Sequence, residues 1–147
     1  MTSRSRVNAR VLPSQMERAD TLRQWWAYHT PSGPYPSRNL ILTSALTKGL
    51  RRLDLCISSG TMHSVVLPET GPVRTYPRVR FDVGLTDFAD RLRGPLYELL
   101  CSKTPPGIRR PAYPSRASIL FLSVEIGLDA LTALYARPAE PTSLQAS

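Results

Sequence analysis

The sequence predicts an α+β fold, in which a small, mostly antiparallel sheet packs with one broken helix, beside an N-terminal helix and Pro-rich loops. Apolar and polar residues alternate in several short segments, as in half-buried strands, and apolar residues recur every three or four positions in two others, as in amphipathic helices. The expected strands follow one another through short turns, which favours antiparallel pairing. A chain of 147 residues is the size of one domain.

Composition divides the chain into three expected parts. A basic N-terminal arm covers residues 1–38, with a helix at about 15–29 and a Pro-rich linker after it. A globular α+β domain covers 39–136, and a polar, proline-broken tail over 137–147 is expected to be disordered.

The arm contains a capping-box pattern, in which Ser14 caps the helix and Glu17 reaches back to it. Met16, Ala19, Leu22 and Trp26 then follow at helical spacing. This helix is expected to dock on the protein's own core, on a partner or on a membrane surface.

Strands are expected over 40–46, 53–57 and 62–67, with Ser59-Gly60 as a hairpin turn before the third. In a further strand over 73–81, Val79 and Phe81 share one face, and arginines and a tyrosine share the other. That basic face suits nucleic acid. It equally suits a solvated edge that charge protects from aggregation.

The clearest helical stripe lies over 85–99, and Gly94-Pro95 is expected to break it into helices at roughly 84–93 and 95–102. Residues 103–116 form a second Pro-rich basic loop. Alternation over 119–126 predicts a central strand, followed by a short helix or strand continuation over 128–135.

Charge is the main indication of function. The formal net charge is +8, and of 19 basic residues only Lys48 and Lys103 are lysines. Arginine forms bidentate pairs with phosphate, so the clustering of cations in the arm and in the second loop favours an anionic partner. A GC-rich or overlapping reading frame would also favour arginine over lysine, and the sequence does not separate these causes.

Catalytic and metal-binding patterns are not evident. Cys56 and Cys101 lie far apart, and together with His29 and His63 they give only four scattered candidates for a zinc site. No Gly-rich phosphate loop occurs. The expectation is a protein without catalysis, cofactor, metal or small-molecule substrate. No secretory signal or membrane-spanning run is expected either, so the predicted location is intracellular: the cytoplasm, the inner membrane face or the nucleus.

Three stretches resemble the rhabdovirus matrix proteins of the vesiculovirus type. They are GPVRTY at 71–76 with the following helix and GPLYELL at 94–100, KTPP at 103–106 with the segment at 119–126, and PSGPY at 31–35. The last is similar to that family's late-domain motifs, although Gly33 replaces an alanine. The resemblance implies a non-enzymatic virion protein that binds the inner membrane leaflet and ribonucleocapsid, self-associates and recruits budding machinery.

The sequence therefore predicts a basic binding protein that contacts RNA, other nucleic acid or an anionic lipid surface, with matrix-like assembly as one form of it. The residues expected to bind are Arg4, Arg6, Arg10, Arg74, Tyr76, Arg78, Arg80, Lys103, Arg109, Arg110 and Arg116. The expected host-protein motif is Pro31, Ser32, Gly33, Pro34 and Tyr35. The alternatives are an accessory viral protein from an overlapping frame, which binds RNA or antagonises host proteins, and a chance open reading frame.

Overall fold

The computed structural model describes residues 5–30, 32–61 and 73–135, which form four α-helices and one pair of antiparallel strands. The order is β1 (Arg6–Arg10), α1 (Pro13–His29), α2 (Arg38–Ser59), the 3-10 turn η1 (Val73–Thr75), β2 (Arg78–Asp82), α3 (Val83–Ser102) and α4 (Arg116–Tyr135). The α+β class holds in this broad sense, but helices dominate and the sheet formed by these described residues has two strands.

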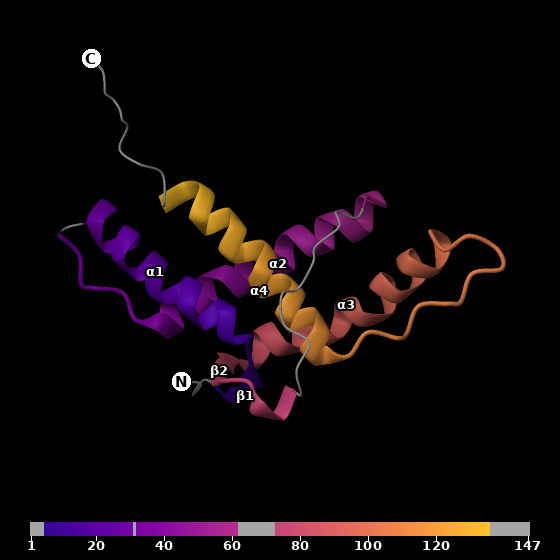
Figure 1. Ribbon diagram of the computed structural model, residues 1–147, viewed down its shortest axis with the longest axis horizontal. Coiled ribbons are helices and arrows are strands. Elements are labelled where there is room, and N and C mark those ends of the chain that lie inside the picture. The colour runs from indigo at the N-terminus through magenta and orange to yellow at the C-terminus, as the bar shows by residue number, and fades with distance from the viewer. Residues whose placement is uncertain (1–4, 31, 62–72, 136–147) are drawn as a thin grey trace, which may run out of the picture.

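The chain consists of two similar halves, each a strand followed by two helices. β1, α1 and α2 make the first half, and β2, α3 and α4 make the second. The sequence repeats with the structure, because Tyr-Pro-Ser-Arg ends the loop between the helices in both halves, at 35–38 and at 113–116. In Figure 1, α2 and α4 cross at the centre, α1 and α3 lie on opposite sides of them, and the strands lie below.

The buried faces of α2 and α4 correspond residue by residue. In α2 they are Ile41, Leu42, Ala45, Leu46, Gly49, Leu50 and Leu53, and in α4 their counterparts, in the same order, are Ile119, Leu120, Ser123, Val124, Gly127, Leu128 and Leu131. The buried residues recur every three or four positions in both helices, so each helix presents one apolar face to the other. They form the centre of the core.

Small residues set the distance between these two helices. A Cβ built at Gly49 would lie 1.6 Å from the backbone oxygen of Ser123, and one built at Gly127 would lie 1.7 Å from that of Ala45. Gly49 corresponds to Gly127, and Ala45 corresponds to Ser123. The two contacts are therefore the same contact made twice, which places an approximate two-fold axis at the crossing.

Equivalent arginine contacts hold the loop between the two helices in each half, and we call each set of contacts a clasp. In the first, Arg38 at the start of α2 binds Asp20 of α1 through Nε and Nη2, at 2.8 and 3.0 Å. Arg23 donates Nε to the Pro36 carbonyl at 2.9 Å, and its guanidinium lies 5.0 Å from the centre of the Tyr35 ring. The hydrogen bonds from Arg38 hold the pKa of Asp20 below its ordinary value.

The second clasp uses the corresponding residues of α3 and α4. Arg116 binds Asp90 through Nε and Nη2, at 3.0 and 2.6 Å, and lowers the pKa of that carboxyl. Arg93 donates Nε to the Pro114 carbonyl at 2.9 Å and lies over the Tyr113 ring at 5.4 Å. The repeat thus extends to individual hydrogen bonds.

The helix expected at 15–29 is present, but it begins at Pro13 and Ser14 does not cap it. Proline suits the first turn because its fixed φ is helical and no N–H is needed there. The Leu12 N–H donates instead to Oε1 of the fully buried Gln15, at 3.0 Å. Val11, Ala19 and Leu22 lie in the main core, so the expected arm is part of the folded body.

The strands expected at 40–46 and 53–57 are wrong, since both segments belong to α2. Ser37 accepts the Leu40 N–H at the start of this helix, and Gly60, with φ of 73°, caps its end rather than forming a hairpin turn. The alternation at 53–57 predicted a strand with Leu53 and Leu55 on one buried face. In the helix Leu55 is instead 68% exposed and does not share a face with Leu53. Residues 62–67 lie outside the described ranges.

Two predictions in the second half are also wrong. The segment 119–126 is helical and belongs to α4, because its apolar residues serve a helix buried on several sides rather than a strand. Gly94-Pro95 does not break α3, which continues through Pro95. Pro95 and Arg91 are both exposed, so water can reach the carbonyl that Pro95 leaves without its helical donor.

The helix α4 is long and apolar enough to cross a membrane by length and composition alone, with a mean hydropathy of 1.7 over its best window. No such segment was expected from the sequence. Within this fold, 44% of that window is buried, much of it against α2. The core therefore accounts for part of its apolar character.

Candidate nucleic-acid interface

The two strands form a ribbon whose outer face is polar and mostly cationic. They pair antiparallel, with Arg6 opposite Asp82, Val7 opposite Phe81, Asn8 opposite Arg80, Ala9 opposite Val79 and Arg10 opposite Arg78. Since opposite residues in such a pair share a face, alternate pairs point the same way. Val79 and Phe81 are buried, so their neighbours point outward.

We define the ribbon face as the outward set Arg6, Asn8, Arg10, Arg78, Arg80 and Asp82. Arg6, Arg78 and Arg80 are exposed and form no ion pair within the described ranges. Arg10 is partly buried and donates Nη1 to the Tyr76 carbonyl at 2.7 Å. The face therefore carries cations available to an external anion.

The ribbon continues at both ends through backbone hydrogen bonds. The Val11 N–H donates to the Pro77 carbonyl at 3.1 Å, and the Val83 N–H donates to the Ser5 carbonyl at 3.0 Å. The inner side chains of Val79 and Phe81 anchor it to the core. A ribbon held at both ends and along its inner face presents its outer side chains from a rigid support.

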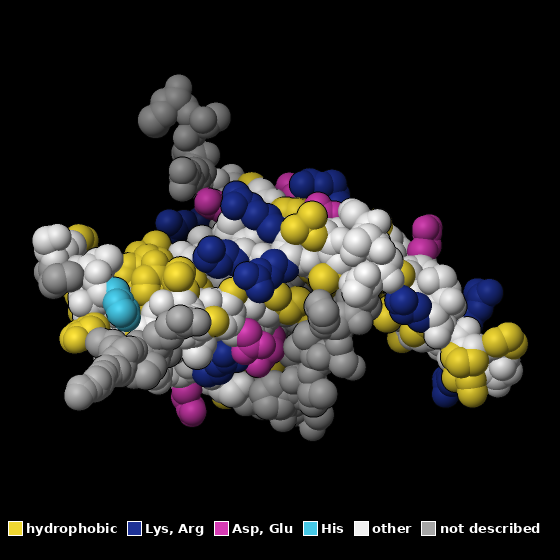
Figure 2. Space-filling view, turned by 90° about the horizontal axis from the view of Figure 1, so that it is seen from above, with side chains coloured by type: hydrophobic (Ala, Val, Ile, Leu, Met, Phe, Trp, Pro, Cys, Tyr) yellow, Lys and Arg dark blue, Asp and Glu magenta, His cyan; other side chains and the backbone are white. Residues whose placement is uncertain are grey.

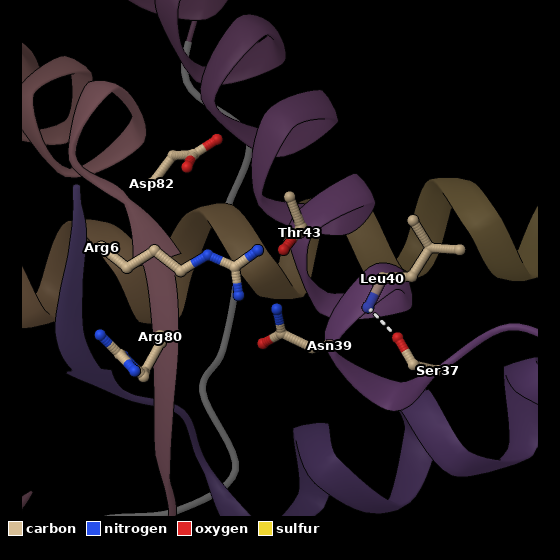
Figure 3. Close-up of a pocket in the computed structure, with 7 residues that line it drawn as sticks. All are labelled: Arg6, Ser37, Asn39, Leu40, Thr43, Arg80 and Asp82. Atoms are coloured by element: carbon tan, nitrogen blue, oxygen red, sulfur yellow. Dashed lines mark hydrogen bonds between the residues drawn. The ribbon is translucent and has the colours of Figure 1, made fainter. Parts of the chain in front are cut away.

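A polar pocket of about 390 Å³ lies between one end of the ribbon and the start of α2. It is lined by Arg6, Ser37, Asn39, Leu40, Thr43, Arg80 and Asp82. Figure 3 shows the Arg6 side chain extending from β1 toward Thr43 and Asn39, while the Ser37 hydroxyl is occupied in capping α2. We call this the α2 pocket. Arg6 and Arg80 give it two cations against the one carboxylate of Asp82, and this net positive charge suits an anionic group next to the ribbon.

In the other half, the position that corresponds to the α2 pocket is filled by apolar side chains. The residues equivalent to Asp82, Arg6, Thr43 and Asn39 are Leu12, Tyr76, Phe121 and Ala117, and these four pack together. The Tyr76 and Phe121 rings meet at 5.7 Å between centroids, in an edge-to-face arrangement. One end of the ribbon is therefore open and polar, whereas the other is closed and apolar.

The structure brings together four of the residues expected to bind anions, namely Arg6, Arg10, Arg78 and Arg80. Tyr76 was placed wrongly, because it is buried under the ribbon rather than on the arginine face. Arg74 is exposed in η1, outside the strand. Arg116 is held by Asp90 in the second clasp. Arg4 lies outside the described residues.

The remaining predicted cations lie elsewhere. Lys103, Arg109 and Arg110 are exposed on the loop between α3 and α4, at one end of the molecule and away from the ribbon (Figure 1). Seen from above, opposite the ribbon, Lys and Arg side chains are interspersed with Asp and Glu (Figure 2). The ribbon face differs from that surface in having four arginines and one aspartate along two short strands.

The expected partner motif lies in the exposed loop between α1 and α2. Ser32, Gly33, Pro34 and Tyr35 are exposed, and Pro31 lies outside the described residues. The Tyr35 ring lies beneath Arg23, as part of the first clasp. This placement gives the segment a role in closing the loop, which sequence reasoning missed.

Sequence reasoning also missed Asn8 and the polar residues of the α2 pocket. The available signal was the repeated Tyr-Pro-Ser-Arg run. It aligns the two halves of the sequence, and this alignment makes the segments of β1 and β2 equivalent. Among the described residues, no three His, Cys, Asp or Glu side chains gather as they would to hold a metal ion.

Comparison of the chain with protein-family models, with curated proteins and with solved structures found no match.

Proposed function

We propose that this protein binds duplex DNA by placing the β1–β2 ribbon in the major groove. The observation that carries the proposal is the pairing of two distant segments into one outward face with Arg6, Asn8, Arg10, Arg78 and Arg80. The major groove of B-DNA is about 12 Å wide and admits a two-stranded ribbon. Strands are an established means of reading it.

The side chains on the ribbon face are of the kinds that recognise base edges. Arginine pairs with guanine through O6 and N7, and asparagine pairs with adenine through N6 and N7. The α2 pocket beside the ribbon supplies a place for a backbone phosphate. Together these groups provide both base contacts and positioning contacts.

Duplex DNA is favoured over duplex RNA by groove geometry. The major groove of A-form RNA is deep and narrow, and side chains do not reach its bases. A rigid two-stranded ribbon anchored on a helical core therefore fits the wider groove of B-DNA. The proposed activity is binding without catalysis.

Contact with an anionic membrane is a second candidate, favoured by the loop over 103–115. Ile108 and Tyr113 are 62% and 56% exposed there, near Lys103, Arg109 and Arg110. A surface cation contributes about 1 kcal/mol of attraction to an anionic leaflet. The resemblance to matrix proteins includes KTPP at 103–106 and belongs with this candidate.

The test measures binding of the full chain to duplex DNA, duplex RNA and phosphatidylserine vesicles over a salt series. Duplex DNA is expected to bind most tightly, with affinity falling steeply as salt rises. The variant Arg78→Ala/Arg80→Ala is expected to lose tenfold or more in DNA affinity. The matched control Arg109→Ala/Arg110→Ala removes the same charge from the loop and is expected to lose about twofold.

Equal losses in the two double variants would mean that net charge alone drives binding, and would overturn the role of the ribbon. Binding to vesicles but not to DNA, with the larger loss in the loop variant, would favour the membrane candidate. Thermal melts test whether both variants keep the fold, which is expected because all four arginines are exposed.

A further inference from the structure

We infer that the ribbon reads an asymmetric DNA site in one fixed orientation. The inference rests on the proposed function and specifies the kind of site that the protein recognises. It follows from differences between two halves that otherwise match closely.

The approximate two-fold axis passes through the ribbon at the facing pair Ala9 and Val79. These two residues are also equivalent in the repeat, since each lies at the same distance before the clasp aspartate of its half, Asp20 or Asp90. The same alignment makes Arg10 equivalent to Arg80. It makes Asn8 equivalent to Arg78.

Two-fold symmetry in a DNA-binding protein is matched by a palindromic site, because equivalent side chains meet equivalent bases. Arg10 and Arg80 retain this symmetry in residue type, although Arg10 is partly buried and bonded to the Tyr76 carbonyl whereas Arg80 is exposed. Asn8 and Arg78 break it at the position next to the axis, where one half presents an amide and the other a guanidinium. Asparagine selects adenine and arginine selects guanine, so the preferred bases differ between the two half-sites.

The ends of the ribbon differ even more. Beside β1 and α2, the open pocket contains the Arg6 and Asp82 side chains. In the other half, Tyr76 and Leu12 occupy the equivalent positions, and both are buried against Phe121. A phosphate can approach the start of α2 through this polar pocket, whereas the start of α4 is flanked by packed apolar side chains. Backbone contacts are therefore stronger on the α2 side.

These two differences lie on the same ribbon and act together. The open pocket fixes which half-site carries the stronger phosphate contact, and Asn8 and Arg78 fix which base each half prefers. A site turned end for end would present the wrong base to both side chains. The complex is therefore directional.

The experiment selects binding sites for the full chain from a library of randomised duplex DNA. A non-palindromic consensus is expected. The wild-type protein is then measured on this consensus and on the two palindromes made from its half-sites. Because one mismatched contact costs about 1–3 kcal/mol, each palindrome is expected to bind roughly tenfold more weakly than the consensus.

The variants Asn8→Arg and Arg78→Asn each make the central ribbon symmetric in a different way. Asn8→Arg is expected to prefer the palindrome of the half-site that Arg78 reads, and Arg78→Asn is expected to prefer the other one. Asn8 and Arg78 are both exposed, so both variants are expected to melt like the wild type.

A palindromic consensus for the wild type would overturn the inference. Retention of the asymmetric preference by both variants would also overturn it, because Asn8 and Arg78 would then not set the difference. Failure of the wild type to bind any duplex at low salt is a separate result, since it would overturn the proposed function itself.

Discussion

Gly127 of α4 lies against the backbone of Ala45 in α2, so closely that a Cβ at Gly127 would be 1.7 Å from the Ala45 carbonyl oxygen. Gly49 makes the equivalent approach to Ser123 from the other helix. The side of each helix that carries the glycine is thereby in direct contact with the main chain of its partner. The two halves of the molecule are joined at this crossing.

Gly127→Ala is expected to destabilise the protein by about 3 kcal/mol or more, because the new Cβ would clash with the backbone of α2, which cannot move away as a flexible side chain can. Gly49→Ala is expected to have a similar effect. The free energy of unfolding in urea measures both. Gly84→Ala is the matched control, since a Cβ there meets nothing within 4 Å and alanine favours the helix. Gly127→Ala melting no lower than Gly84→Ala would contradict the close crossing.

Pro95→Ala is expected to stabilise the protein. Pro95 is exposed inside α3, where it lacks an N–H for the carbonyl one turn earlier. Proline in a helix interior is about 3 kcal/mol less favourable than alanine, and part of that difference should be recovered, roughly 1–3 kcal/mol. Thermal unfolding measures the gain. A lower melting temperature for the variant would show that α3 depends on its proline.

Gln15→Leu is expected to cost about 1–3 kcal/mol, because it leaves the Leu12 N–H without its acceptor in a buried place. The change also removes the bond from Nε2 to the Phe121 carbonyl, at 2.9 Å, which ties α1 to α4. Gln24→Leu on the exposed side of the same helix serves as the control and should change stability by less than about 0.5 kcal/mol. Equal unfolding free energies for the two variants would contradict the assigned role of Gln15.

The two clasps predict a loss of stability in acid. Arg38 and Arg116 lower the pKa of Asp20 and Asp90 in the folded state. Their contribution is therefore complete above the unfolded pKa of about 3.9 and disappears as the pH falls through the lower folded values. Both carboxylates are partly exposed, at 43% and 31% of the side chain, so each clasp contributes about 1 kcal/mol or less.

Asp20→Asn/Asp90→Asn should accordingly be less stable than the wild type at pH 7, and the two should converge as the pH falls through the lowered folded-state pKa values of the two aspartates. Urea unfolding across this range measures the difference. Asp54→Asn is the control, since Asp54 is exposed and forms no ion pair within the described ranges. A difference that stays constant down to pH 2 would mean that ionisation of the clasps is not its source.

Local pattern was enough to predict part of the fold. The stripe that ends at Trp26 predicts α1, the alternation of Val79 and Phe81 predicts β2, and the stripe around Leu92 predicts α3. In each case one face is apolar and the other is polar, so periodicity identifies the element. The basic loop after α3 was also predictable, because its prolines exclude regular structure.

The central helices could not be predicted in the same way. Residues 119–126 are apolar at nearly every position, since α4 is covered by α1, α2 and α3, and a short apolar run does not distinguish a helix from a strand. The cations of the candidate site were recognised individually. Their meeting depends on pairing β1 with β2 across about half of the chain, which no local window contains. Only the repeated Tyr-Pro-Ser-Arg run relates the two distant segments.

Both strands of the ribbon belong to one polypeptide, which changes how recognition depends on concentration. A ribbon shared between separate subunits forms only above their dissociation constant, so dilution removes the binding surface. Here β1 finds β2 within its own chain, and the ribbon is complete in every folded molecule. Occupancy of a single site should therefore rise with the first power of protein concentration, without the steeper onset of a dimerising protein.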